Sequence, residues 1–113
     1  MSAFFESEVV RKEMTDIQEL QEEIYESVFQ FPQMDVEDQV EHIELLVELL
    51  KKQQILYTRM SLSDDPAAKK MKENIQQSAV MMGMPKDVDM SNVFKNMEKM
   101  IEVMRQQVDR KPS

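Results

Sequence analysis

The side chains that could carry chemistry are few, and the single histidine comes first among them. His42 stands four residues after Asp38, so both side chains would share one face of a helix, where two ligands can begin a metal site. A di-iron helical bundle needs paired Glu-x-x-His motifs and several inward glutamates, whereas the acids here fall mainly on the polar sides of the expected helices. We therefore expect an exposed helical histidine and no metal site.

Nucleophilic catalysis would depend on the same imidazole, because a serine or threonine needs an adjacent base. None of the hydroxyl residues stands in a strand-turn-helix elbow, and one glycine cannot build a phosphate-binding loop. The carboxylates look solvated, so they lack the contrasting environments that an acid–base pair requires. The sequence therefore predicts a protein that is not an enzyme, with no catalytic residue and no cofactor. The hydroxyl candidates are Ser27, Ser61, Ser63, Ser78, Ser91 and Thr15 or Thr58.

Charge is divided unevenly along the chain. Residues 1–50 carry two bases against fourteen acids, a net charge of −12, and residues 51–113 carry twelve bases against eight acids, a net charge of +4. The acidic half would repel nucleic acid and anionic membranes, and we expect it to bind neither. It is either a solvated helix face or a surface that docks on a basic partner. The acids of the possible docking surface are Glu19, Glu22, Glu23 and Glu26.

The basic run at residues 69–72 is short and lacks interleaved aromatic residues, which favours a solvated helix face over a nucleic-acid-binding site.

The composition is typical of an all-α protein. The chain has 113 residues with one glycine and four prolines, and the helix formers Glu, Gln, Lys, Met and Leu dominate. We expect one domain over residues 1–113 with about four helices. The lack of cysteine excludes disulfides and thiolate metal sites. No apolar run approaches the roughly 18 residues that cross a bilayer, and the start does not resemble a signal peptide, so we expect a cytoplasmic protein.

Two long antiparallel helices are expected in the first part of the chain. The first is predicted at residues 7–30, with Ser7 as its cap, and it ends before Pro32 because proline disfavours α geometry in the preceding residue. The second is predicted at residues 36–60, with Asp35 as its N-cap. Both carry apolar side chains at helical spacing.

Two shorter helices are expected in the second part. Asp64 or Asp65 would cap the first of them, Pro66 would occupy its first turn, and Gly83 would stop it. This helix is weakly hydrophobic, so it should be the least stable element. The two helices are predicted at residues 66–82 and 89–109, before a frayed tail at residues 110–113.

The centre of the second long helix is too apolar for one short chain to cover. Residues 43–50 are apolar around most of the helix, and each apolar face must be buried against something. A second copy of the chain is the simplest cover, so we expect a helical-bundle homodimer with coiled-coil-like packing. The expected interface residues are Ile43, Leu46, Val47, Leu49, Leu50 and Tyr57.

Two further features leave alternatives open. Methionine is concentrated in the second half of the chain, where it would form either a Met-rich core or an adaptable docking groove. Met82 and Met84 are possible partner-binding residues on the second alternative. Phe4 and Phe5 would either staple the start of the first helix or insert into a pocket of a partner.

Three stretches of the sequence resemble a known family. They are Phe4-Phe5-Glu6-Ser7-Glu8-Val9-Val10, then Tyr57-Thr58-Arg59-Met60-Ser61-Leu62-Ser63-Asp64-Asp65, then Met82-Gly83-Met84-Pro85. In this order and spacing they resemble a small cyanobacterial family of unknown function that also occurs in contractile-tailed, myovirus-type cyanophages. The resemblance implies an all-helical fold in a cyanobacterial cytoplasm, and it implies no activity, cofactor or catalytic residue. The first helix is more acidic than in typical members, which would suit a phage-carried version adapted to a new partner.

Three functions follow as hypotheses. The leading one is a non-enzymatic protein–protein interaction or regulatory protein that pairs with itself and acts on an unidentified host protein. The second is an acidic binder of a basic surface on host transcription or nucleic-acid-binding machinery. The third, of another class, is a metal-binding helical bundle, which would need His42 buried beside converging carboxylates.

Overall fold

All the regular elements in the part of the chain that the structure describes are helices, which confirms the all-α class. The computed structural model describes residues 3–81, 83–87 and 89–110, and no strand occurs among them. None of the helices in these ranges combines the length and the apolar composition needed to cross a bilayer. The elements are α1 (Ala3–Glu6), α2 (Glu8–Ser27), the 3-10 helix η1 (Val28–Gln33), α3 (Val36–Leu62), α4 (Pro66–Met81) and α5 (Met90–Asp109).

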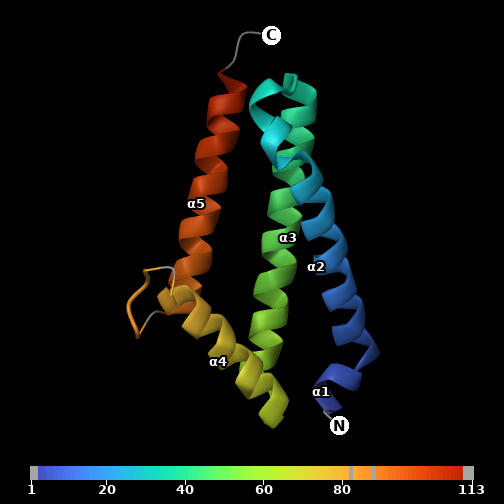
Figure 1. Ribbon diagram of the computed structural model, residues 1–113, viewed down its shortest axis with the longest axis vertical. Helices are drawn as coiled ribbons and strands as arrows, with labels where there is room; N and C mark the ends of the chain where they lie inside the picture. Colours follow the sequence, from blue (N-terminus) through green and yellow to red (C-terminus); the bar gives the residue numbers. More distant parts are fainter. Residues whose placement is uncertain (1–2, 82, 88, 111–113) are drawn as a thin grey trace.

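The three longest helices form a single layer (Figure 1). Helix α3 lies in the middle and runs antiparallel to α2 on one side and to α5 on the other, so α2 and α5 point the same way. In the described part of the chain α2 and α5 form no packed interface with each other. Helix α4 crosses the foot of the layer and packs on α3, and the whole molecule measures 52 × 32 × 19 Å. Both broad faces of α3 therefore lack a covering helix over much of their length.

The turn between α2 and α3 is a 3-10 helix. The α geometry ends at Ser27, three residues before the predicted end, and η1 carries the chain through Pro32. Proline lacks an N–H and constrains the residue before it, so the chain tightens into i→i+3 bonds instead of continuing an α-helix. Asp35 then caps α3 by accepting from the Asp38 amide at 2.9 Å. The Gln39 side chain donates to the Phe31 carbonyl oxygen at 2.8 Å, which fastens the turn to α3.

The start of α4 is joined to the N-terminus through one carboxylate. Asp65 Oδ1 accepts from the Ala67 amide and Oδ2 accepts from the Phe4 amide, both at 2.9 Å. Of the two predicted caps, Asp65 is therefore the one that satisfies the first turn of α4. The short helix α1, which sequence reasoning did not predict, packs on α4 through this junction. Ser7 occupies the cap position of α2, but its side chain makes no capping hydrogen bond.

Glycine and aspartate define the connection from α4 to α5. Gly83 has φ +103°, its amide donates to the Val80 carbonyl oxygen at 3.0 Å, and the Met84 amide donates to that of Ala79 at 3.1 Å. This pair of bonds is the Schellman pattern, which requires the left-handed geometry that glycine adopts without strain. Asp89 caps α5 by accepting from the Ser91 amide at 3.0 Å. The predicted helix end and partner-binding residue Met82 lies outside the described residues.

The core is a thin seam along α3. Polar contacts reinforce its edges, since Lys52 pairs with Asp16 at 3.2 Å and Arg59 with Glu13 at 2.8 Å. Both pairs are partly exposed, so each adds about 1 kcal/mol at most to stability. Apolar burial must therefore supply most of the stabilisation. The buried apolar residues are Val10, Leu20, Ile24, Ile43, Leu50, Met60, Ala68, Met90 and Val108.

Candidate interaction surfaces

His42 is buried at the top of the α2–α3 hairpin and is not the exposed residue that the sequence predicted. Its side chain is 4% exposed, its Nδ1 lies 3.1 Å from Ser27 Oγ, and its ring lies 5.2 Å from that of Phe31. Burial lowers the pKa of His42 below its usual 6.5, so the neutral imidazole is favoured at pH 7. The histidine therefore stabilises the hairpin in its uncharged form.

The contact between Ser27 and His42 lacks the other parts of a nucleophilic site. The Ser27 hydroxyl also lies within hydrogen-bond distance of the carbonyl oxygens of Glu23 and Ile24, which favours a helix-bound hydroxyl over an activated one. A substrate could not reach an imidazole that is 4% exposed without opening the hairpin. Among the described residues, no group of three or more His, Asp or Glu side chains converges to hold a metal ion.

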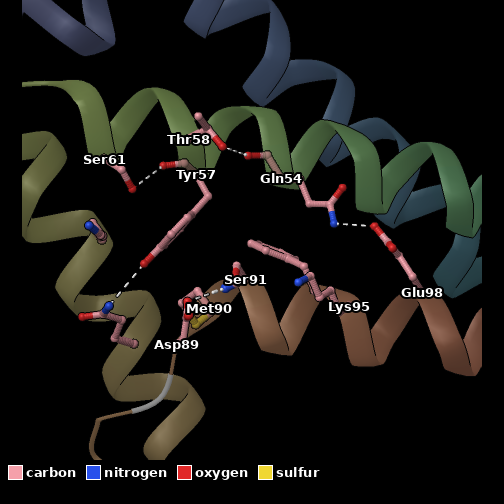
Figure 2. A pocket seen from close by; sticks show the side chains of 12 residues that line it. Gln54, Tyr57, Thr58, Ser61, Asp89, Met90, Ser91, Lys95 and Glu98 are labelled. Atoms are coloured by element: carbon pink, nitrogen blue, oxygen red, sulfur yellow. Dashed lines mark hydrogen bonds between the residues drawn. The ribbon is translucent and has the colours of Figure 1, made fainter.

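Tyr57 marks a polar cleft of about 530 Å³ between α3, α4 and the start of α5 (Figure 2). Its hydroxyl accepts from Gln76 Nε2 at 3.2 Å, its ring meets Phe94 edge to face at 5.8 Å, and the Lys72 ammonium stands 5.6 Å from the ring centre. Gln54 Nε2 also donates to Glu98 Oε1 at 2.8 Å across the cleft. Burial, and secondarily the charge of Asp89, raises the pKa of Tyr57 despite the bond from Gln76. These contacts join three helices, which explains why Tyr57 is half-buried within its own chain.

A second cleft, of about 580 Å³, lies between α2 and α5 on the other side of Tyr57 and is lined mainly by apolar side chains. Helix α3 provides its floor and α4 closes its foot. We call this cleft, together with the extension along α5 described next, the apolar groove. Its lining includes Met14, Ile17, Gln18 and Gln21 of α2, Gln53, Leu56 and Met60 of α3, Met71 and Ile75 of α4, and Met90 and Phe94 of α5.

The apolar groove continues along α5 as a methionine stripe. Four residues share the side of α5 on which Met90 lies, because they follow it at helical spacing: Val93, Met97, Met100 and Met104. Lys95 and Glu98 lie on the other side of α5 and line the polar cleft. Met100 is 68% exposed and Met97 39% exposed, so this stripe is left largely uncovered. From the sequence, these methionines could belong either to a core or to a docking groove. The exposed fractions of Met97 and Met100 place these two side chains on the surface of the single chain.

Helix α2 contributes a matching edge that sequence reasoning did not identify. Met14, Gln18, Gln21 and Tyr25 recur at steps of four, three and four, and Tyr25 is 74% exposed. This spacing can be found in the sequence, but α2 also carries a more strongly apolar stripe that dominates the pattern. That stripe, Val10, Leu20 and Ile24, faces α3 and is buried.

The predicted interface residues divide between the core and the surface. Ile43 and Leu50 are buried by the chain's own helices, and the other four, Leu46, Val47, Leu49 and Tyr57, are half-buried. Leu46 lies two helical turns before Gln53, which lines the apolar groove, so Leu46 continues the floor of the groove. The structure thus leaves part of the 43–50 segment uncovered in a single chain.

The four acids of the predicted docking surface are all exposed. Glu19 and Glu23, one helical turn apart, line a shallow cleft with Glu48 of α3. That side of α2 is opposite to the side that lines the apolar groove. We call this region, with the exposed Glu22 and Glu26, the acidic face. The acidic face extends round α2 to the edge of the apolar groove, because Glu22 accepts a hydrogen bond at 3.4 Å from Gln18, which lines the groove.

The two aromatic residues near the N-terminus are occupied within the chain. Phe4 and Phe5 are half-buried, their rings meet edge to face at 4.9 Å, and the Phe4 amide is bound by Asp65. The Phe4 amide thus joins α1 to the start of α4, and the two predicted roles of the rings, as a helix staple or as a partner anchor, stay predictions. Met84, the other possible partner-binding residue, is 38% exposed beside the turn after α4.

No curated protein and no solved structure matches this chain. A family model does match it, over residues 2–108, and so covers every helix up to the last turn of α5. The family of unknown function that the sequence motifs implied is thereby shown, whereas its distribution among cyanobacteria and their phages stays an expectation. The chain belongs to the family described as a domain of unknown function (DUF1825).

Proposed function

We propose that the protein is a non-enzymatic interaction protein whose apolar groove binds another polypeptide. The observation that carries the proposal is the open layer, in which α2 and α5 flank α3 and leave the apolar groove between them uncovered. A helix laid in such a groove would bury apolar side chains of both molecules, each worth about 1.5–3 kcal/mol when fully buried. Methionine suits this use because its unbranched side chain adapts to the shape of a partner.

The placement of the polar side chains supports the same proposal. The imidazole of His42 is enclosed in the hairpin, and the Tyr57 cleft is crossed by hydrogen bonds between helices. These groups are used to hold the layer together. The apolar side chains of the groove and the carboxylates of the acidic face, by contrast, are exposed groups that these contacts leave uncovered.

A lysine in the methionine stripe tests the proposal. Met100→Lys places a charge in the apolar groove and should weaken binding of the polypeptide partner by about tenfold or more, because a buried unpaired charge is costly. Sedimentation measures binding to a second copy, and affinity capture from the source cell measures binding to other proteins.

Glu102→Lys is the matched control, since Glu102 is two residues away on the polar side of the same helix. It should leave binding intact, and circular dichroism should show both variants fully helical. Equal binding by wild type and Met100→Lys in both measurements would remove the groove from the function.

The acidic face favours a second candidate function. It would dock on a basic surface of host transcription or nucleic-acid-binding machinery, in a phage-infected cyanobacterial cell if a phage encodes the protein. The support is the exposure of all four acids and the net charge of −12 in the first fifty residues. Such a face steers association electrostatically rather than supplying most of the affinity.

Salt and charge neutralisation test this second candidate. Replacing Glu19, Glu22, Glu23 and Glu26 by glutamine should release the captured partner, and so should raising the salt to roughly 0.5 M, because screening shortens the range of charge attraction to a few ångströms. Met100→Lys serves here as the control that leaves the acidic face unchanged. A partner retained through both treatments would exclude an electrostatic docking role.

A further inference from the structure

The isolated chain exposes more surface than a compact protein of its size. Its accessible surface is 8384 Å², whereas a folded monomer of 13.4 kDa exposes about 6,500 Å². Its radius of gyration is 16.2 Å, against about 13 Å for a domain of this length. The difference in area, about 1,900 Å², arises because three long helices lie in one layer without closing into a bundle.

This excess has the size that a second copy would bury. Each partner contributes about 800 Å² to an interface of standard size, and more than about 1,000 Å² in an obligate homodimer. A standard interface would therefore use a little under half of the excess, and an obligate homodimer a little over half. A homodimer interface is also self-complementary, and an apolar groove of this kind can cover its own copy.

Two layers can be placed groove to groove about either of two twofold axes. An axis across the helices would set α2 against α2 of the partner, and an axis along α3 would set α2 against α5 of the partner. Helix α2 carries seven acids and two bases, whereas α5 carries three of each. The first arrangement aligns two strongly acidic helices, and the second pairs an acidic helix with one that has no net charge. Charge favours the second.

We infer that two copies pack groove to groove about a twofold axis along α3, so that α2 of each copy lies beside α5 of the other. This inference rests on the proposed function, because it names the polypeptide that the apolar groove binds. It buries Tyr25 and Met100, the two most exposed apolar side chains on the edges of the groove. Glu19 and Glu23 stay outside, on the side of α2 away from the groove, where they remain free for another partner.

The ion pairs and hydrogen bonds of α3 set the register of this packing. Lys52 reaches Asp16 of α2 and Gln54 reaches Glu98 of α5, so Asp16 and Glu98 lie at about the same height along α3. Helices α2 and α5 run in the same direction, and rotation about an axis along α3 preserves height. Gln18 and Met100, each two residues further along, therefore lie at matching heights on facing edges of the two copies.

Cross-linking between single-cysteine variants tests this arrangement, because the native chain has no cysteine. Gln18→Cys and Met100→Cys chains carrying different tags are co-expressed and treated with a short bis-maleimide. We expect a species with both tags, and we expect neither variant to cross-link when expressed alone. Gln18→Cys with Glu102→Cys is the control, since Glu102 is at a similar height but on the polar side of α5, and it should not cross-link.

Other outcomes overturn the inference in distinguishable ways. Cross-linking of Gln18→Cys to itself would place α2 on α2 and contradict the axis. A wild-type chain that sediments as a monomer at all concentrations, while Met100→Lys still abolishes capture of another protein, would exclude the second copy and leave the proposed function standing. A monomer that captures nothing in a groove-dependent way would contradict both.

Discussion

At the scale of single residues, local signals predicted helix ends well and burial poorly. Asp35 caps α3 as predicted, and Asp89 caps α5 at the predicted start of that helix, because capping depends on amides only two or three residues away. The burial of His42 depends on η1 folding back so that Phe31 and Ser27 reach the ring. A contact between separate elements produces no periodic pattern in the sequence, so the sequence analysis predicted an exposed histidine.

His42 should make stability depend on pH. Burial lowers the pKa of its imidazole in the folded state, so below the unfolded pKa of about 6.5 the unfolded chain binds more protons than the folded one. Its contribution to stability is therefore full above that pH and is lost as the pH falls from 6.5 toward the lowered pKa. The free energy of unfolding should decline by at most about 1.4 kcal/mol per pH unit from this one proton.

Denaturant unfolding of wild type and His42→Gln at several pH values between about 7.5 and 5 measures this dependence. Glutamine keeps a side chain that can bond to Ser27 but does not titrate. The difference in unfolding free energy between the two proteins should change as the pH falls, in the direction that disfavours wild type. A difference that stays constant over this range would show that His42 does not titrate on unfolding.

At the scale of elements, the junction between the N-terminus and α4 joins two of the family-resembling stretches in space. Phe4 belongs to the first stretch and Asp65 to the second, and the Phe4 amide donates to the Asp65 carboxylate. The sequence predicted that Asp64 or Asp65 caps α4, but not the bond from Asp65 to a residue 61 positions away. The helix α1 was missed for the same reason, since four residues form a stable helical turn only when tertiary contacts hold them.

Removing the Asp65 carboxylate should therefore disturb two elements at once. Asp65→Ala eliminates an N-cap bond, worth about 1 kcal/mol, and a second charge-assisted bond to the Phe4 amide, so we expect the protein to lose about 1–3 kcal/mol of stability. Asp64→Ala is the control, because Asp64 is exposed and makes neither of these bonds.

Denaturant midpoints measure the loss, and hydrogen exchange locates it. Asp65→Ala should increase exchange in α1 and in the first turn of α4 while α2 and α3 stay protected. Equal midpoints for the two aspartate variants would mean that the junction contributes nothing to stability.

At the scale of the whole molecule, the sequence predicted the class of fold but not the arrangement of its helices. Periodicity in α2 and α3 indicated two long helices and their buried stripes, and residues 43–50 indicated apolar surface in excess of what one chain covers. The lateral order α2–α3–α5 depends on which faces meet, and several apolar faces compete for α3. Tyr57 shows the consequence, since the sequence did not predict that it joins α3 to α4 and α5 within one chain, while its predicted role between copies stays a prediction.

In the proposed pair of copies, the shared direction of α2 and α5 would give the assembly a polarity. Rotation about an axis along α3 returns each helix to the same heading, so both α1 helices would lie at one end of the long axis and the last turns of both α5 helices at the other. One end would then present two Phe4–Asp65 junctions and the opposite end two η1 turns. A ligand arriving at either end would meet a duplicated surface, and the two ends would be chemically unlike.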